Sequence, residues 1–443
     1  MNDVICARIT AAGIAAIAVI RICGKGCIPL VAKYFRPADK LLKAAPNSVI
    51  FGTFYDPDSN MALDEVLLSV FHAPKSYTGE DTVELSCHGN PALTDRILTA
   101  LLSRARLANP GEFTLRAYLN GKMDLSQAEA VNDLILASSS KAETAALMQI
   151  KGYLGKHLSE LLQDIQDARL RCELAIDFSD QDLPQIDVQD LGWRLANILS
   201  TARALQEEGR SGIKLREGIK ICLAGAPNSG KSSLFNAFLK QKRAIVTPHP
   251  GTTRDYLEES FSLSGYPIVL YDTAGLRDSE DEIEKEGIAR SYALIQNADL
   301  ILYLYEGDFT ELPEDWQAFQ DKLICVAAKA DIYPQRHIPQ GHVESSALCP
   351  NGLKALSDAI LQRLKLPAVN LEHPLITNVR HLAALSRSIS ALEAAQAALQ
   401  QELGWEFIAF ELILAVSALE EILGLTPSDE LLGRIFDEFC IGK

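Results

Sequence analysis

The stretch 225–233, Gly-Ala-Pro-Asn-Ser-Gly-Lys-Ser-Ser, constrains the fold of this chain more than any other. It follows an apolar, strand-like run (219–224) and opens a helix-like run (234–239). The pattern G-x-x-x-x-G-K-[ST] forms a turn whose backbone N–H groups surround a phosphate, because glycine adopts backbone angles that a Cβ forbids. Lys231 then reaches the β- and γ-phosphates, Ser232 ligates Mg²⁺, and the helix N-terminus adds its positive field. The alternative is that Gly225 and Gly230 only form a turn between two elements. The strand before the motif and the helix after it disfavour this interpretation.

The order of elements around this loop predicts the fold of its domain. Residues 214–370 alternate helical runs with strand-like runs at 219–224, 261–263, 268–271, 300–305 and 323–327. This alternation is typical of a Ras-like, doubly wound α/β sheet, in which ligands bind at the carboxyl ends of the strands.

Two more motifs carry groups suited to phosphate and magnesium. Asp272-Thr273-Ala274-Gly275 follows the run 268–271, so the Asp272 carboxylate can hold Mg²⁺ through water and the Gly275 N–H can contact the γ-phosphate. Gly251-Thr252-Thr253-Arg254 lies between the first helix and that strand, the place of a switch whose Thr253 hydroxyl completes the magnesium shell.

Two further motifs indicate that the base is guanine. Asp331 of Lys329-Ala330-Asp331 suits the N1–H and exocyclic amine of guanine, while Lys329 packs across the base, and Ser345-Ser346-Ala347 adds a backbone donor to the guanine carbonyl. The base motif normally begins with Asn, but Ala328 stands there, and the lost contacts cost about 1 kcal/mol or more, which predicts weak nucleotide affinity with fast exchange. The predicted GTP-binding residues are Asn228, Ser229, Gly230, Lys231, Ser232, Ser233, Thr247, Gly251, Thr252, Thr253, Asp272, Thr273, Ala274, Gly275, Lys329, Asp331, Ser346 and Ala347.

The rest of the chain separates into an α+β part and a helical part. Residues 1–120 mix β-like runs (16–22, 48–55, 66–71, 81–87) with one helix (91–105), which predicts an α+β domain. Residues 121–213 and 371–443 carry long helical runs (127–176, 192–210, 379–403, 407–423), which predicts one all-α domain in two sequence pieces with the α/β domain, 214–370, inserted between them. The stretch 207–212 reads as a helix end and linker.

Composition favours a soluble, cytoplasmic protein. The 443 residues are 48% hydrophobic and 23% charged. Nine scattered cysteines without metal-like pairing favour reduced thiols, and carboxylates interrupt the apolar stretch 407–425, so no membrane segment is expected. The net charge of −16 disfavours a surface that coats nucleic acid. If the protein contacts RNA directly, residues 1–120, with 12 basic and 11 acidic side chains, or a partner protein are the likelier contact.

The motifs resemble those of the translation-factor-related GTPases and, within them, the MnmE (TrmE) family of tRNA modification GTPases. Asn228 in the phosphate loop, the switch 251–255 and the sequence 272–277 leading to Glu284 carry this resemblance. It extends to the motifs at 79–85, 88–89, 110–114, 120–125 and 439–443, and therefore covers nearly the whole chain.

The resemblance implies how hydrolysis proceeds. Leu276 stands where Ras-like proteins carry a glutamine that orients water, so another group must do this, and the family's glutamate falls on Glu284. The residues alone leave open that Glu284 only offsets a helix dipole. The family also uses K⁺ at the phosphates, implying Asn228, Thr247, His249 and Thr252 as ligands, with Ser232 and Thr253 on Mg²⁺. The catalytic residues implied are Glu284, Lys231, Asn228 and Gly275.

The resemblance also implies a ligand for residues 1–120, which composition alone does not reveal. Arg21, Glu84 and Lys122 would be surface charges without it, but they fall on family positions that bind a 5-formyl- or methylene-tetrahydrofolate. Glu84 suits the bidentate pterin edge, while Arg21 and Lys122 suit its carbonyl or glutamate tail. The terminal Cys-x-Gly-Lys implies that Lys443 reaches the folate, and the role of Cys440 stays open.

The implied function is a K⁺-stimulated GTPase that forms a homodimer through its folate-binding domain. With an MnmG (GidA)-type partner that uses FAD and NADH, in a heterotetramer or larger complex, it would install an aminomethyl-type group at C5 of the wobble uridine of certain tRNAs. Two alternatives stay open. One is a ribosome-assembly GTPase of the Era/Der kind, which the absence of a basic RNA-binding module disfavours. The other is a mechanical switch with a vestigial folate site.

Overall fold

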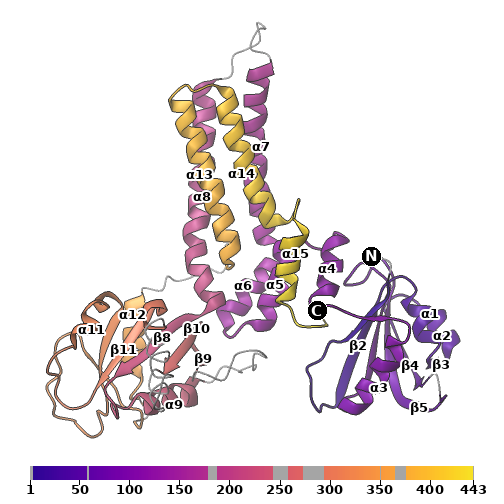
Figure 1. The fold of residues 1–443 in the computed structure, drawn as a ribbon, viewed down its shortest axis with the longest axis horizontal. Helices are drawn as coiled ribbons and strands as arrows, with labels where there is room; N and C mark the ends of the chain where they lie inside the picture. The colour runs from indigo at the N-terminus through magenta and orange to yellow at the C-terminus, as the bar shows by residue number, and fades with distance from the viewer. Residues whose placement is uncertain are drawn as a thin grey trace, which may run out of the picture. The chain divides into compact units, whose positions relative to one another are not determined.

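The protein forms two compact units, described by a computed structural model (Figure 1). Unit 1 comprises Met1–Asn132 and Leu423–Lys443, and unit 2 comprises Asp133–Ile422. The structure describes residues 3–56, 59–177, 187–242, 258–272, 294–349, 351–364 and 376–442.

Unit 1 is built on a seven-stranded sheet in the order β3-β4-β5-β6-β2-β1-β7. Neighbouring strands in this sheet are antiparallel, except that β1 and β7 are parallel. Alternate residues of the strands form a core with helices α1 (Cys27–Ala32), α2 (Ala38–Leu42) and α3 (Pro91–Leu102). This arrangement confirms the α+β fold expected for the N-terminal part. The strands are β1 (Ile5–Arg8), β2 (Ile17–Cys23), β3 (Phe35–Arg36), β4 (Ser48–Tyr55), β5 (Ala62–Phe71), β6 (Thr82–His88) and β7 (Arg106–Leu107).

The end of the chain packs into unit 1 beside α4 (Glu112–Leu119) and the start of α5 (Leu125–Leu136). Phe436 of α15 (Asp429–Asp437) is buried there, and a Cβ on Gly111 would lie 2.9 Å from its ring. Pro110 and Ile441 form an isolated β-bridge. Residues 110–111 and 441–442 therefore lie together, although more than three hundred positions separate them in the sequence.

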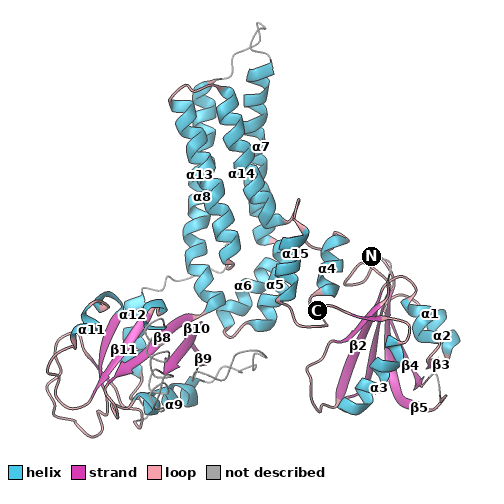
Figure 2. Cartoon of the chain, in the orientation of Figure 1, coloured by secondary structure: helices cyan, strands magenta, loops and turns pink. Residues whose placement is uncertain are grey.

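Long helices from two pieces of sequence form one bundle in unit 2 (Figure 2). Helix α8 (Val188–Glu217) packs against both α7 (Tyr153–Asp177) and α13 (Val379–Gln400). The Ser388 hydroxyl of α13 donates to the Ala415 carbonyl of α14 (Trp405–Leu423) at 3.0 Å. The shorter α6 (Ser140–Ile150) precedes α7. Within the described part of the chain, no helix is both long and apolar enough to cross a membrane.

The linker expected at 207–212 is wrong, because α8 continues without a break to Glu217. Gly209 and Gly212 are buried inside this helix. A Cβ on Gly209 would lie 3.0 Å from the Cβ of Ile376, so the glycine allows close packing and does not end the helix.

The inserted domain has a six-stranded sheet in the order β13-β12-β11-β8-β10-β9. All neighbours are parallel except β9 and β10. Along β8, Ile221 and Leu223 enter one core while Cys222 and Ala224 enter another, so both faces are covered, as the doubly wound fold predicts. The strands are β8 (Ile219–Gly225), β9 (Glu258–Leu263), β10 (Tyr266–Asp272), β11 (Leu300–Tyr305), β12 (Leu323–Ala327) and β13 (Val343–Glu344). The helices described with both ends include α9 (Lys231–Lys242), α11 (Glu314–Gln317) and α12 (Lys354–Leu364).

Candidate functional site

The phosphate loop leaves β8 in a conformation that its glycines permit. Gly225 has φ +132°, and a Cβ there would lie 2.1 Å from the Leu304 carbonyl oxygen of β11. Asn228 and Gly230 also have positive φ, at +61° and +98°, before α9 begins at Lys231. Asparagine tolerates this left-handed region better than most residues, which explains how the loop curls without a third glycine.

The charged groups expected at the phosphates come together at this loop. Lys231 is buried, and its ammonium donates to the carbonyls of Gly225 (3.0 Å) and Ala226 (2.8 Å). The Ser232 hydroxyl at the start of α9 donates to Asp272 at the end of β10, at 3.2 Å. These two oxygens match the oxygen ligands that Mg²⁺ takes, so Ser232 would bind the ion directly and Asp272 would bind it through water.

The loop also retains a polar group suited to a ligand. The Ser229 side chain is 2% exposed, and its hydroxyl has no hydrogen-bond partner among the described residues. Buried hydroxyl groups normally have a hydrogen-bond partner. The Ser229 hydroxyl is therefore suited to donate a hydrogen bond to a phosphate oxygen bound in this loop.

Two of the predicted base-binding residues, Asp331 and Ser346, line one pocket of about 510 Å³. Ser346 donates to Asp331 at 2.6 Å, and both line this pocket. Lys329, with φ +58°, places its Cε 3.8 Å from where a Cβ on Gly230 would stand, so it spans from the base motif to the phosphate loop. Ala347 packs against the core of the sheet.

Glu306 belongs to this site but escaped sequence reasoning. It follows β11, and its carboxylate accepts from Lys329 (2.7 Å) and from the Tyr333 hydroxyl (2.9 Å). These hydrogen bonds, together with the charge of Lys329, hold the pKa of Glu306 below its ordinary value. Its position directly after a parallel strand was the available signal.

Several predicted residues lie outside the part of the chain that the structure describes, and their roles stay predictions. They are Thr247, His249, Gly251, Thr252, Thr253, Thr273, Ala274, Gly275, Glu284 and Lys443.

Arg21 and Glu84, predicted for folate, are cross-strand neighbours on β2 and β6 and form an ion pair at 2.8 Å. The guanidinium carbon of Arg21 lies 5.2 Å from the ring centroid of Tyr77 and 5.3 Å from that of Phe113. Burial raises the pKa of Tyr77, whose hydroxyl hydrogen-bonds to Thr114 at 2.9 Å. The site therefore combines a charge pair with two aromatic rings.

Lys122 contacts the same loop, 74–81, that carries Tyr77. Its ammonium donates to the Pro74 carbonyl at 3.0 Å, and its stem lies 3.5 Å from where a Cβ on Gly79 would stand. Tyr77 was not singled out from the sequence, because a lone tyrosine in a loop carries no motif.

A cluster of buried charged side chains, which we call the Arg116 cluster, contacts this loop through Glu80. The Arg116 side chain is 1% exposed and pairs with Asp3 (2.8 Å), Glu80 (3.0 Å) and Glu112 (3.0 Å). Arg106 completes the cluster by pairing with Asp3 and Glu112, each at 2.7 Å. Glu80 lies in the loop with Tyr77, so the cluster ties that loop to α4.

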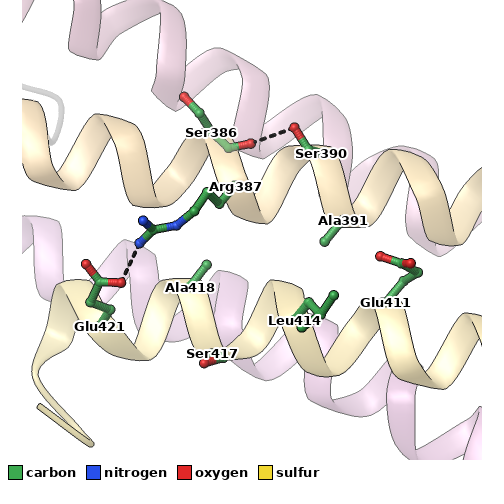
Figure 3. Close-up of a pocket in the computed structure, with 9 residues that line it drawn as sticks. All are labelled: Ser386, Arg387, Ser390, Ala391, Glu411, Leu414, Ser417, Ala418 and Glu421. Atoms are coloured by element: carbon green, nitrogen blue, oxygen red, sulfur yellow. Dashed lines mark hydrogen bonds and ion pairs between the residues drawn. The ribbon is translucent and has the colours of Figure 1, made fainter. Parts of the chain in front are cut away.

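A groove of about 620 Å³ runs between α13 and α14 on the bundle (Figure 3). An ion pair between Arg387 and Glu421 joins the two helices there. None of the residues predicted from the sequence lines it, and we assign it no role.

Comparisons with known proteins cover the whole chain. Residues 125–440 match the family described as MnmE helical domain, and residues 4–122 match the one described as GTP-binding protein TrmE N-terminus. The chain is 38% identical over 455 residues to the tRNA modification GTPase MnmE of Aquifex aeolicus and 40% identical over 471 residues to that of Moorella thermoacetica, with 100% of each chain covered in both cases. The G domain of the T. maritima FeoB iron transporter is 30% identical over 33% of this chain and 98% of its own, with a TM-score of 0.24.

Proposed function

The chain belongs to the MnmE family of tRNA modification GTPases and is a GTP hydrolase, and from this premise we propose the reaction it serves. With an MnmG-type partner that uses FAD and NADH and with a tetrahydrofolate one-carbon donor, it installs an aminomethyl-type group at C5 of the wobble uridine of certain tRNAs. One combination of features supports this proposal: the same chain carries a phosphate loop with a base pocket and an Arg21–Glu84 ion pair whose guanidinium lies near two aromatic rings.

The geometry supports separate roles for residues at the phosphates, the base and the magnesium ion. Lys231 lies where its ammonium can exchange the carbonyls of Gly225 and Ala226 for phosphate oxygens. Asp331 holds the guanine edge and Lys329 its face, while Ser232 and Asp272 hold Mg²⁺, which offsets the charge on the phosphates. Glu284 orients the attacking water, since Leu276 cannot accept or donate a hydrogen bond.

K⁺ stimulation is part of the proposal. Asn228 and the switch backbone at Thr247, His249 and Thr252 supply the ligands of a monovalent cation, which offsets transition-state charge where no arginine finger is evident in the sequence. The left-handed conformation of Asn228 agrees both with this role and with a plain turn. The response to different cations, treated below, separates the two.

The Arg21–Glu84 pair suits a reduced folate. The Glu84 carboxylate can accept two hydrogen bonds from the pterin edge, and Arg21 is then released to a carbonyl or to the glutamate tail. Tyr77 and Phe113 offer ring faces beside it, and Lys122 and Lys443 add positive charge for the tail. The folate supplies the one-carbon unit when bound.

The open face of the unit 1 sheet supports a homodimer. Phe51 of β4 and Leu67 of β5 are register partners, and both are exposed, as are Val49 and Ile17 on the same sheet. Exposed apolar side chains on neighbouring strands are typical of an interface, and a second copy would cover them.

Nucleoside analysis of bulk tRNA tests the proposal. A strain without this gene should lack the modified wobble uridine, and the wild-type gene should restore it. A Lys231→Ala variant should fail to restore it, and a Glu84→Ala variant should fail as well while hydrolysing GTP normally. A full complement of modified uridine in the deletion strain, or a defect confined to ribosomal subunits, would contradict the proposal and favour a ribosome-assembly GTPase.

A further inference from the structure

The base-recognition motif of this chain lacks the side chain that usually anchors it. Ala328 follows β12 and is 6% exposed, and its methyl group lies 3.8 Å from the position of a Cβ on Gly230. An asparagine at 328 would face the phosphate loop with an amide, whereas the alanine methyl offers no hydrogen bond. The backbone that leads to Lys329 and Asp331 must therefore be held in another way.

The buried side chain of Arg336 contacts this backbone. Its side chain is 3% exposed, and its two terminal nitrogens donate to the carbonyls of Ala327 and Ala328, each at 2.5 Å. Ala327 ends β12 and Ala328 begins the base motif. The planar, forked guanidinium is suited to bind two neighbouring carbonyls at once, and it fixes their relative orientation.

Within the described parts of this domain, no stronger contact explains why a guanidinium is buried at this place. Its nearest carboxylate, Glu344 of β13, lies 3.7 Å away and is 45% exposed, so their attraction is screened by water. Its Nε has no hydrogen-bond partner among the described residues. The two carbonyls are therefore the main polar partners that hold the buried charge.

The contact also reaches the second base motif. The Ala327 carbonyl accepts from the Ser345 N–H at 3.0 Å as well as from Arg336, and the Ala330 N–H donates to the Ser345 carbonyl at 3.2 Å. Ser346, the next residue, donates to Asp331. Arg336 thus braces the end of β12, where the first guanine-binding segment starts and to which Ser345, directly after β13, is hydrogen-bonded.

We propose that Arg336 is a positioning residue for guanine recognition and that it replaces, from behind the loop, the anchor that Ala328 cannot supply. It does not touch the nucleotide. It holds the backbone so that Asp331 meets the N1–H and exocyclic amine of the base.

Binding of fluorescent GDP to the full chain tests this role. Arg336→Ala removes two charge-assisted hydrogen bonds, and we expect the Kd for GDP to rise about tenfold. Arg336→Lys, which retains the charge but not the fork, should give an intermediate Kd. The kcat at saturating GTP should stay near the wild-type value, because the phosphate loop is untouched. Arg363→Ala on α12 is the matched control, since Arg363 also donates to a backbone carbonyl, that of Gln320, but away from the base pocket.

Two readouts separate positioning from a purely structural role. Inosine diphosphate lacks the exocyclic amine that Asp331 binds, so the preference for GDP over this analogue should shrink in Arg336→Ala. Adding Ala328→Asn to Arg336→Ala should restore part of the GDP affinity. A lower melting temperature with unchanged Kd and unchanged base preference would overturn the proposal, as would a double variant with no recovered affinity.

Discussion

Replacing Arg116 by leucine should destabilise unit 1 far more than replacing an exposed arginine. Arg116 is 1% exposed, and one of its partners, Glu112, has a side chain that is only 3% exposed. Removing one partner of a buried ion pair costs about 3–5 kcal/mol, because the remaining charge stays buried without compensation. Glu112 keeps Arg106 and the Asn109 N–H as partners, so we expect the lower value, about 3 kcal/mol.

The pKa of Glu112 gives the same variant a pH signature. Burial alone raises this pKa, but hydrogen bonds from Arg106, the Asn109 N–H and Arg116 outweigh burial and lower it from the ordinary value of 4.5. A lowered folded-state pKa adds stability above the unfolded pKa, and this stability is lost as the pH falls through the lowered value. In Arg116→Leu the pKa rises, so acid unfolding should begin at a higher pH than in the wild type.

Hydrogen exchange of the full chain at neutral pH measures the effect locally. Amides of β2 and β6 should exchange about a hundredfold faster in Arg116→Leu, since each 1.4 kcal/mol is about a factor of ten. Arg96→Leu on the exposed face of α3 is the control and should change exchange little. Removing Glu112 as well, in Arg116→Leu/Glu112→Leu, should recover part of the protection. Unchanged exchange in the single variant, or a double variant no better than the single one, would refute this account of the Arg116 cluster.

Further predictions concern the two binding sites. Gly225→Ala should abolish GDP binding in a titration, because its Cβ would meet the Leu304 carbonyl at 2.1 Å; wild-type binding would refute the reading of this close approach. Asp331→Asn should shift the preference from GTP to XTP in competition assays, and a retained preference for GTP would count against its assignment to the base. Wild-type GTP hydrolysis should be faster in K⁺ than in Na⁺, and Asn228→Ala should remove the difference; equal wild-type rates in both salts would exclude the cation role. Glu84→Ala should lose binding of 5-formyltetrahydrofolate by calorimetry, while an unchanged isotherm would place the folate elsewhere.

The local elements of the fold were predictable because they depend on short-range patterns. The strands at 48–55, 300–305 and 323–327 begin and end where their apolar runs do. Very short strands such as β3 and β7 were missed, because two residues carry no period and are stabilised only by their neighbours in the sheet. The predicted helix end at 207–212 was wrong because Gly209 has two possible roles. A glycine that ends a helix and a glycine that allows close packing cannot be distinguished from the sequence alone.

The sequence by itself determined the chemistry of the nucleotide site, since the loop 225–233 and the motifs at 272 and 331 each carry their groups within a few residues. Only the tertiary structure decided what supports those groups. In the folded protein, Glu306 pairs with Lys329, and Arg336 donates a hydrogen bond to the Ala328 carbonyl. The Arg116 cluster is buried and contacts the loop that carries Tyr77. Such contacts join segments that are distant along the chain, and the energy of a buried charge depends on partners that no local pattern reveals.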